Sequence, residues 1–233
     1  MIEGGGALDP AALDLRGLFR DRDMFDSRSS WSEAGFEILN RSSNGKIMVA
    51  RHLTVRGLLF KKYTTSVARR DQRKNYECRV EGSRRLRALA EGRGLTRIRV
   101  PRKWIVTLPW SSREDPLLVV ERLELMGSEQ TVSAYRRIDE ELLGQLCTVL
   151  FHFRGMDSNA NNLPFLTGGR IGLVDTEHWD RGTRRGYLHH LRDHMSSYGR
   201  KIAKKIFRRL RHDDSRDGGS VAADQADCRD QSR

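Results

Sequence analysis

The stretch MDSNANNLPFLTGGRIGLVDTE, residues 156–177, places carboxylate and amide side chains on both sides of an apolar segment. Asp157 begins the polar motif, Asn162 follows five positions later, and Asp175 comes directly after the apolar run IGLV. The glycine-rich turn TGGR between LPFL and IGLV predicts a small hairpin over residues 163–174. Because a hairpin brings its two ends together, we expect Asp157, Asn162 and Asp175 to converge at its open end.

Two carboxylates and an amide in one place suit a hard divalent cation. Mg²⁺ takes a few protein oxygens and completes its shell with phosphate oxygens and water. Asp157 has an alternative role as the group that takes a proton from an attacking hydroxyl. Each residue also has a purely structural interpretation: a helix-terminal turn for Asp157, a loop amide for Asn162 and a strand end for Asp175.

The chain before this stretch predicts a sheet interrupted by one helix. Asn44-Gly45 is a hairpin signal, and SSREDP, residues 111–116, reads as a surface turn. Residues 70–93 have apolar side chains at helical spacing among many arginines, which predicts a basic amphipathic helix. Five strands are expected, over residues 35–40, 46–55, 56–65, 102–108 and 117–123.

The second half of the chain is expected to be mostly helical, so the fold class is α+β. A long helix is predicted over residues 138–156, and one or two basic helices over residues 187–210. Residues 1–34 are expected to form a partly ordered extension. The polar, acidic residues 213–233 are expected to be disordered, because they offer little apolar surface to bury.

A phosphate clamp is expected on the third strand. Lys61 and Lys62 are adjacent there, so that one faces inward and the other outward. An inward lysine is held best by a carboxylate, and the following helix offers Glu77 and Glu81 one turn apart on one face. The alternatives are a solvated lysine and a Glu81 that pairs with an arginine of its own helix.

The order of these features resembles that of the protein-kinase-like superfamily, which includes protein kinases and the aminoglycoside-phosphotransferase-like small-molecule kinases. Asp157 and Asn162 match the D-x-x-x-x-N step of the catalytic loop. The resemblance covers about residues 35–185 and is to a minimal, atypical bacterial kinase. It implies a two-lobed fold, with a five-stranded antiparallel N-lobe sheet plus helix over residues 35–126. It also implies a reduced, mostly helical C-lobe over residues 127–212.

The resemblance implies an ATP- and Mg²⁺-dependent phosphotransferase that acts on a hydroxyl of an unknown small molecule or protein. LLFK (58–61) is similar to the strand that carries the phosphate-binding lysine, which favours Lys61 over Lys62. The remaining implied roles are Asp157 as proton acceptor; Asn162, Asp175 and Glu177 as metal ligands; Glu81 as partner of Lys61; Glu121 in the adenine-binding segment LVVERLELM (118–126); and Gly45 in the loop over the nucleotide.

Several positions depart from the kinase pattern. Gly155-Met156 stands where His-Arg precedes the catalytic aspartate, and Asp175-Thr176-Glu177 stands in place of Asp-Phe-Gly. The nucleotide-covering loop has only Gly45, which supplies fewer backbone N–H groups near the phosphates. These departures favour an alternative function, a pseudokinase or binding module that acts through its basic surface.

The composition favours an anionic partner. The 233 residues carry a net charge of +12, and residues 51–104 and 181–211 hold most of the excess lysine and arginine. A basic nucleic-acid-associated protein is a further alternative, although it is not favoured, because aromatic residues form only 7% of the chain. No apolar run is long enough for a transmembrane helix. No secretory signal is expected and three cysteines form no disulfide framework, so we expect a cytoplasmic protein and leave export into a host cell open.

Overall fold

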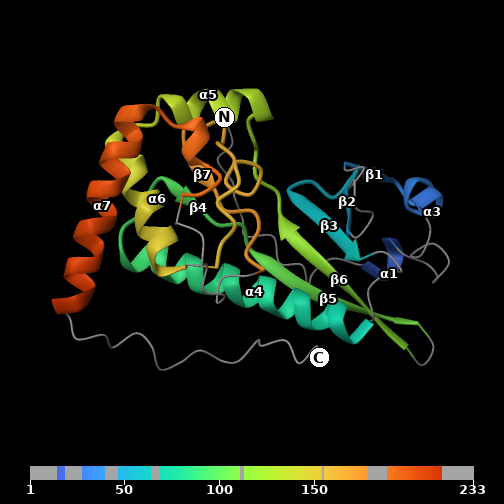
Figure 1. Cartoon of the computed structure of the whole chain (residues 1–233). Helices are drawn as coiled ribbons and strands as arrows, with labels where there is room; N and C mark the ends of the chain where they lie inside the picture. The colour runs from blue at the N-terminus through green and yellow to red at the C-terminus, as the bar shows by residue number, and fades with distance from the viewer. Residues whose placement is uncertain are drawn as a thin grey trace. The chain divides into compact units, whose positions relative to one another are not determined.

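An antiparallel sheet of five strands is formed in the computed structural model, which describes residues 15–18, 28–39, 47–63, 69–110, 113–153, 155–177 and 188–216. The strands are β1 (Phe36–Ile38), β2 (Ile47–His52), β3 (Leu58–Tyr63), β5 (Lys103–Trp110) and β6 (Arg113–Glu121). They lie in the order β1-β2-β3-β6-β5 (Figure 1). The α+β class and the predicted five-stranded antiparallel sheet are therefore confirmed.

One face of this sheet is covered by the segment that precedes it. Trp31 of α3 (Arg28–Glu33) is fully buried and packs at 4.7 Å, between ring centroids, against Phe36. Leu18 of the short helix α1 (Leu15–Leu18) is partly buried against the same face. Part of the N-terminal extension is therefore integral to the core. The buried residues on this face are Trp31, Phe36, Met48, Ala50, Leu58, Phe60, Leu117 and Val119.

The opposite face of the sheet packs against α4 (Arg69–Gly92) through Tyr76. Tyr76 is fully buried, and its hydroxyl accepts a hydrogen bond from the backbone N–H of Tyr63 at 2.8 Å. The same hydroxyl donates to the backbone carbonyl of Lys61 at 3.2 Å. Burial raises the pKa of Tyr76, so the hydroxyl stays protonated and both bonds persist. The phenol thus fixes the end of β3 to the helix.

The start of β6 differs most from the strand boundaries expected from the sequence. The segment 111–116 was expected to be a surface turn, whereas β6 already begins at Arg113 and pairs in register with β5, Trp110 opposite Arg113. Only residues 111 and 112 lie between the two strands, outside the described residues. Pairing along the whole length of β5 outweighs the local turn propensity of Ser, Asp and Pro.

The chain divides into two compact units, which are described separately. The sheet unit consists of Met1–Val80 and Arg102–Arg122, and the helical unit consists of Glu81–Pro101 and Leu123–Arg233. The expected boundary near residue 126 places residues 81–101 with the sheet. They belong instead to the helical unit, because Leu86, Leu95, Ile98 and Val100 are buried in its hydrophobic core.

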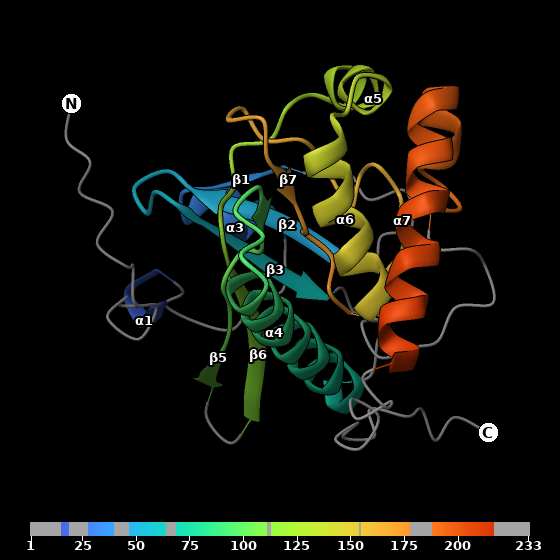
Figure 2. The ribbon, with the colours of Figure 1, turned by 90° about the vertical axis from the view of Figure 1, so that its left-hand side faces the viewer.

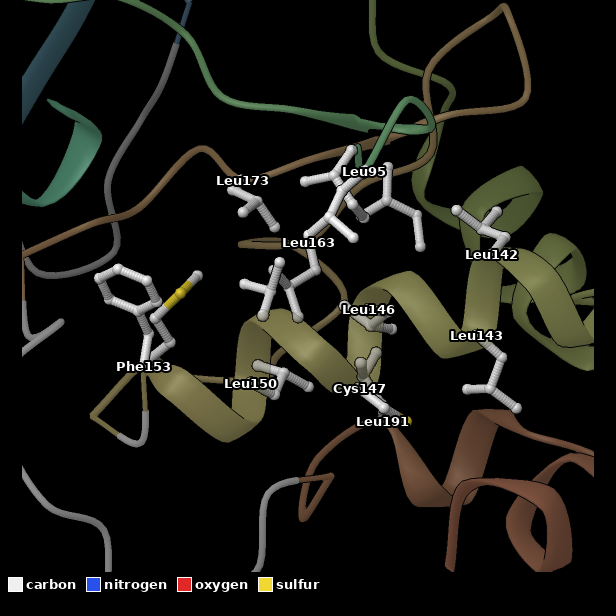
Figure 3. Packing of buried hydrophobic residues seen from close by; sticks show 14 of the residues in the cluster. Leu95, Leu142, Leu143, Leu146, Cys147, Leu150, Phe153, Leu163, Leu173 and Leu191 are labelled. Carbon is white, nitrogen blue, oxygen red and sulfur yellow. The ribbon is translucent and has the colours of Figure 1, made fainter. Parts of the chain in front are cut away.

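The helical unit is built around α6 (Glu140–His152), with α7 (Ser197–Arg216) alongside it (Figure 2). Asp139 caps α6 by accepting a hydrogen bond from the N–H of Leu142 at 2.8 Å. The apolar side of α6 points into the core (Figure 3). Its buried residues are Leu142, Leu143, Leu146, Cys147, Val149, Leu150 and Phe151.

Four features of the helical unit differ from expectation. The helix α5 (Ser128–Arg136), the two-residue strand β4 (Ile98–Arg99) and a 3-10 turn (Arg192–His194) were not predicted. Residues 213–216, placed in the expected disordered tail, form the last turn of α7, and residues 217–233 lie outside the described residues. Among the described residues, no helix is both long and apolar enough to cross a membrane.

Replacing Tyr76 by Phe tests how the sheet is fixed to α4. The loss of the hydroxyl leaves the N–H of Tyr63 and the carbonyl of Lys61 without this partner, so the free energy of unfolding should fall by about 1 to 3 kcal/mol. Chemical denaturation measures the change. Tyr198→Phe, at an exposed tyrosine, is the matched control and should change the free energy of unfolding by less than about 0.5 kcal/mol. Equal effects of the two substitutions would contradict this role of Tyr76.

Candidate functional site

Residues 162–174 form the small hairpin that the sequence predicts. The N–H of Leu166 donates to the carbonyl of Arg170 at 2.8 Å, next to the turn. Farther along, the N–H of Val174 donates to the carbonyl of Asn162 at 3.0 Å. Gly169 within the turn has φ +68, a conformation that glycine adopts readily. The hairpin therefore holds the residue before Asp175 against Asn162.

A second ladder supports the outer side of the same segment. β7 (Ile171–Gly172) pairs in parallel with β4. The N–H of Ile171 donates to the carbonyl of Arg97 at 3.0 Å, and that of Leu173 donates to Arg99 at 2.9 Å. Leu173 is fully buried beside Leu163 in the core (Figure 3). The backbone that leads to Asp175 is thus hydrogen-bonded on both edges.

The polar loop 157–162 is anchored by small buried residues. Ser158 and Ala160 are buried, at 4% and 8% exposure, whereas the side chain of Asp157 is 50% exposed. The carbonyl of Asn159 accepts hydrogen bonds from the N–H groups of Asn162 and of the following leucine, at 2.9 and 3.0 Å. This tight turn presents Asp157 to solvent while its neighbours face the core.

Asp157 and Asn162 are in direct contact. The Nδ2 atom of Asn162 donates to Oδ2 of Asp157 at 3.1 Å. Just beyond the loop, the buried hydroxyl of Tyr135 donates to the carbonyl of Leu163 at 2.6 Å, which fixes the backbone there. The D-x-x-x-x-N spacing thus brings its two polar side chains together.

The carboxylate of Asp175 is oriented by the backbone that follows it. Its Oδ1 atom accepts a hydrogen bond from the N–H of Glu177 at 3.2 Å. Thr176, between them, is fully buried, whereas Asp175 and Glu177 are partly exposed. The hydrogen bond of Val174 to Asn162 places the backbone just before Asp175 beside the end of the polar loop, and a convergence of the three side chains stays a prediction.

His190 is a neighbour of Asp157 that the sequence-based reasoning missed. Its Nε2 atom lies 3.7 Å from Oδ1 of Asp157, and its ring packs edge-on against that of His189 at 4.7 Å between centroids. Thirty-three residues separate His190 from Asp157, and no spacing rule connects them.

The carboxylate and amide oxygens of this site are ligands that a hard cation such as Mg²⁺ prefers. Because the amide nitrogen of Asn162 is directed at Asp157, the amide oxygen is directed away from that carboxylate. No group of three or more His, Cys, Asp or Glu side chains is arranged for metal binding within the described residues. Any cation held by Asp175, Glu177 and Asn162 therefore depends on phosphate oxygens and water for the rest of its shell.

In the sheet unit, the alternation of β3 distinguishes Lys61 from Lys62. Lys61 lies opposite Val49 and Leu118, and Leu118 belongs to the buried cluster on the α4 face. Lys62 lies opposite Met48, which belongs to the buried cluster on the other face. Lys61 is thus the lysine on the helix-facing side of the sheet, and both lysines are partly buried.

Glu81 is engaged by arginines of its own helix. Arg84 donates to both of its carboxylate oxygens at 2.7 Å, and Arg85 donates to Oε1 at 2.6 Å. The guanidinium of Arg84, with help from that of Arg85, holds the pKa of Glu81 at about 2. Glu77 is likewise paired with Arg73, at 3.2 Å. These contacts match the alternative of intrahelical pairing, and a pairing of Glu81 with Lys61 stays a prediction.

Two further residues, Glu121 and Gly45, were expected to contact the nucleotide. Oε2 of Glu121 accepts a hydrogen bond from the N–H of Arg102 at 3.0 Å, so that this carboxylate fastens the end of β6 to the start of β5. Gly45 lies outside the described residues. Their roles toward a nucleotide stay predictions.

Comparison with known proteins adds no family. No protein-family model matches the chain, and no curated protein matches it significantly.

The pairing of Glu81 predicts a dependence of stability on pH. Its pKa lies near 2 in the folded protein and near 4.5 when unpaired, so the carboxylate stabilises the fold above pH 4.5 and loses this effect as pH falls toward 2. Glu81→Gln should lower the free energy of unfolding by about 1 kcal/mol at pH 7, after allowance for solvent screening. The difference from the unchanged protein should shrink below pH 4.5.

Urea denaturation at a series of pH values measures this difference. Glu91→Gln is the control on the same helix, because the carboxylate of Glu91 is 75% exposed and lies 3.8 Å from Arg87. It should change the free energy of unfolding by less than about 0.5 kcal/mol throughout. A Glu81→Gln difference that stays constant down to pH 2.5 would count against the pairing.

Proposed function

We propose that the protein is an ATP- and Mg²⁺-dependent phosphotransferase with a two-lobed, kinase-like fold, acting on a hydroxyl acceptor. The observation that carries the proposal is the junction at Asn162. Its side chain donates to Asp157 and its carbonyl accepts from Val174, the residue before Asp175. A proton acceptor and two oxygen ligands for a cation thus follow one another around a single hairpin.

The roles of the residues follow from their chemistry. Asp157, partly exposed and oriented by Asn162, accepts the proton of the attacking hydroxyl. The amide oxygen of Asn162 and the carboxylates of Asp175 and Glu177 hold Mg²⁺, which when bound neutralises charge on the nucleotide phosphates. Lys61, on the helix-facing side of β3, binds the phosphates, with Lys62 as the fallback.

Contacts to the nucleoside belong to the same proposal. Glu121, the last residue of β6, belongs to the proposed adenine-binding segment 118–126, and Gly45 belongs to the loop over the phosphates. The expected fold also assigns the sheet unit to nucleotide binding and the helical unit to catalysis. The acceptor is a hydroxyl of a small molecule or of a protein, and the proposed place of action is the cytoplasm.

A second candidate is a pseudokinase, with the same fold and weak or absent nucleotide binding. The engagement of Glu81 by Arg84 and Arg85 favours it, because a carboxylate held by two guanidinium groups is less available to Lys61. Nucleotide binding and turnover, measured separately, distinguish the two candidates.

Binding is tested by thermal denaturation with ATP, with and without Mg²⁺. If the protein is the proposed phosphotransferase, ATP with Mg²⁺ at about a hundredfold excess over Kd should raise its melting temperature by about 5 to 10 °C. Asp175→Ala should remove the Mg²⁺-dependent part of this rise, because Mg²⁺ has few protein ligands to spare. Asp193→Ala, at an exposed aspartate of the 3-10 turn, is the control and should keep it. A rise that Asp175→Ala leaves unchanged would refute the metal site.

Turnover is tested by release of ADP, with water in place of the unknown acceptor. Asp157→Asn should leave the ATP-dependent thermal shift within about 1 °C of the unchanged protein and lower the rate by about 10²- to 10⁴-fold, because only proton acceptance is lost. Asp193→Asn serves as the matched control. If the unchanged protein binds ATP but its rate equals that of Asp157→Asn, the pseudokinase takes the place of the enzyme.

A further inference from the structure

The outward side of α7 carries a dense run of cations. The segment RKIAKKIFRRLR, residues 200–211, holds seven lysines and arginines and no acidic residue. All seven are exposed, whereas Ala203 and Phe207 in the same segment are buried. The cations are Arg200, Lys201, Lys204, Lys205, Arg208, Arg209 and Arg211, and we call their surface the α7 basic face.

Helix geometry gathers these cations on one side. Each residue turns the helix by about 100°, so positions 201, 204, 208 and 211 align in one row, with 205 and 209 beside it. The row lies opposite Gly199, Ala203 and Phe207, which are buried, and it extends about 15 Å along the helix axis. The α7 basic face is therefore a regular row of cations on one side of a helix.

Within the part of the chain that the structure describes, few carboxylates lie near these cations. On α4, the arginines at 73, 84 and 87 each pair with a glutamate of the same helix. On the α7 basic face, only Arg209 has a carboxylate within ion-pair distance among the described residues, that of Asp213 at 3.9 Å. Arg200 donates to a backbone carbonyl, that of Arg192. The array thus keeps most of its charge available for an anionic partner.

The other residues of α7 argue against two classes of partner, a lipid bilayer and single-stranded nucleic acid. Ile202, Ile206 and Leu210 pack against the core of the helical unit, so that the helix has no apolar side left to insert into a lipid bilayer. The four positions of the row hold no aromatic ring on which unpaired bases could stack. The exposed rings on this side of α7, Tyr198 and His212, lie beyond the two ends of the row, and the hydroxyl of Tyr198 is bonded to Glu140.

A regular array of cations with no stacking or insertion group between them matches a regular array of phosphates. We propose that the α7 basic face binds double-stranded nucleic acid through its phosphates, without preference for base sequence. Four to six phosphate contacts make the logarithm of the binding constant fall with the logarithm of salt concentration at a slope of about −4 to −5. This binding is independent of phosphotransfer, because no residue of the polar loop takes part.

Fluorescence anisotropy with labelled 20-base-pair duplexes of RNA and DNA tests the proposal, over about 50 to 200 mM salt. The variant Lys201→Gln, Lys204→Gln, Lys205→Gln, Arg208→Gln should weaken duplex binding at least about tenfold and reduce the size of the salt slope by about 4. Its ATP-dependent thermal shift should equal that of the unchanged protein, so that failure here and failure of the phosphotransferase proposal are distinguishable.

The matched control removes the same number of positive charges, four, from exposed sites outside α7. It is Arg93→Gln, Arg136→Gln, Arg137→Gln, Arg170→Gln, at side chains that are all exposed. It should weaken binding by less than about threefold. Equal losses in the two variants would show an effect of net charge alone and overturn the proposal.

Two further measurements decide the class of ligand, and a third applies if the fourfold variant misfolds. A single strand of the same length that binds more tightly than either duplex would overturn the choice of a duplex. Vesicles of 30% phosphatidylserine that bind the protein while an excess of duplex fails to displace them would overturn the choice of nucleic acid. Should the fourfold variant lose its helical circular dichroism, Lys204→Gln and Arg208→Gln singly should each reduce the salt slope by about 1. An unchanged slope in both would overturn the proposal.

Discussion

The segment 171–174 depends on backbone hydrogen bonds along both of its edges, and the candidate site depends on that segment. On one edge it pairs with β4, and on the other it pairs with the residues that follow the polar loop. A strand paired on both edges has few ways to shift, because a slip by one residue would turn the buried Leu173 outward. This pairing therefore fixes the backbone position of Asp175, the next residue.

Arg97 connects the hairpin that leads to Asp175 with the start of α6. Arg97 donates to both carboxylate oxygens of Asp139, at 2.8 and 2.7 Å, and to the carbonyl of Gly169 at 3.2 Å. Asp139 is also the N-cap of α6, and the N–H of Leu142 together with Arg97 lowers its pKa. The start of α6, the strand β4 and the turn of the hairpin are therefore tied to one another through one planar guanidinium group.

The parts of the fold that could be predicted from the sequence are those with a strong local pattern. Apolar runs bounded by turn residues indicated the strands of the sheet, and helical spacing indicated α4 and α6. β4 has only two residues, and nothing near Ile98 in the sequence indicates that its partner is Ile171. The end of α7 was missed because Asp213 and Asp214 resemble a polar tail, although a helix can continue through exposed polar residues.

The candidate site shows the same division. The backbone contact of Val174, the residue before Asp175, with Asn162 follows from a hairpin that the turn TGGR signals locally. The face on which Lys61 lies required the register of β3, since two adjacent lysines have equivalent sequence patterns. His190 contacts Asp157, and Arg84 pairs with Glu81, although each carboxylate has several neighbours of suitable charge. Composition and spacing do not indicate which of these neighbours forms the pair.

The pairing of β4 with β7 also has a consequence for the order of folding. Ile98 and Ile171 are 73 residues apart in the chain, so their pairing closes a long loop and carries an entropic cost that grows with loop length. The helices α5 and α6 form from local contacts and need no such closure. A nascent chain can therefore form its central helices before Asp175 is in place, and the chemistry of the site becomes available only when this long-range pairing has formed.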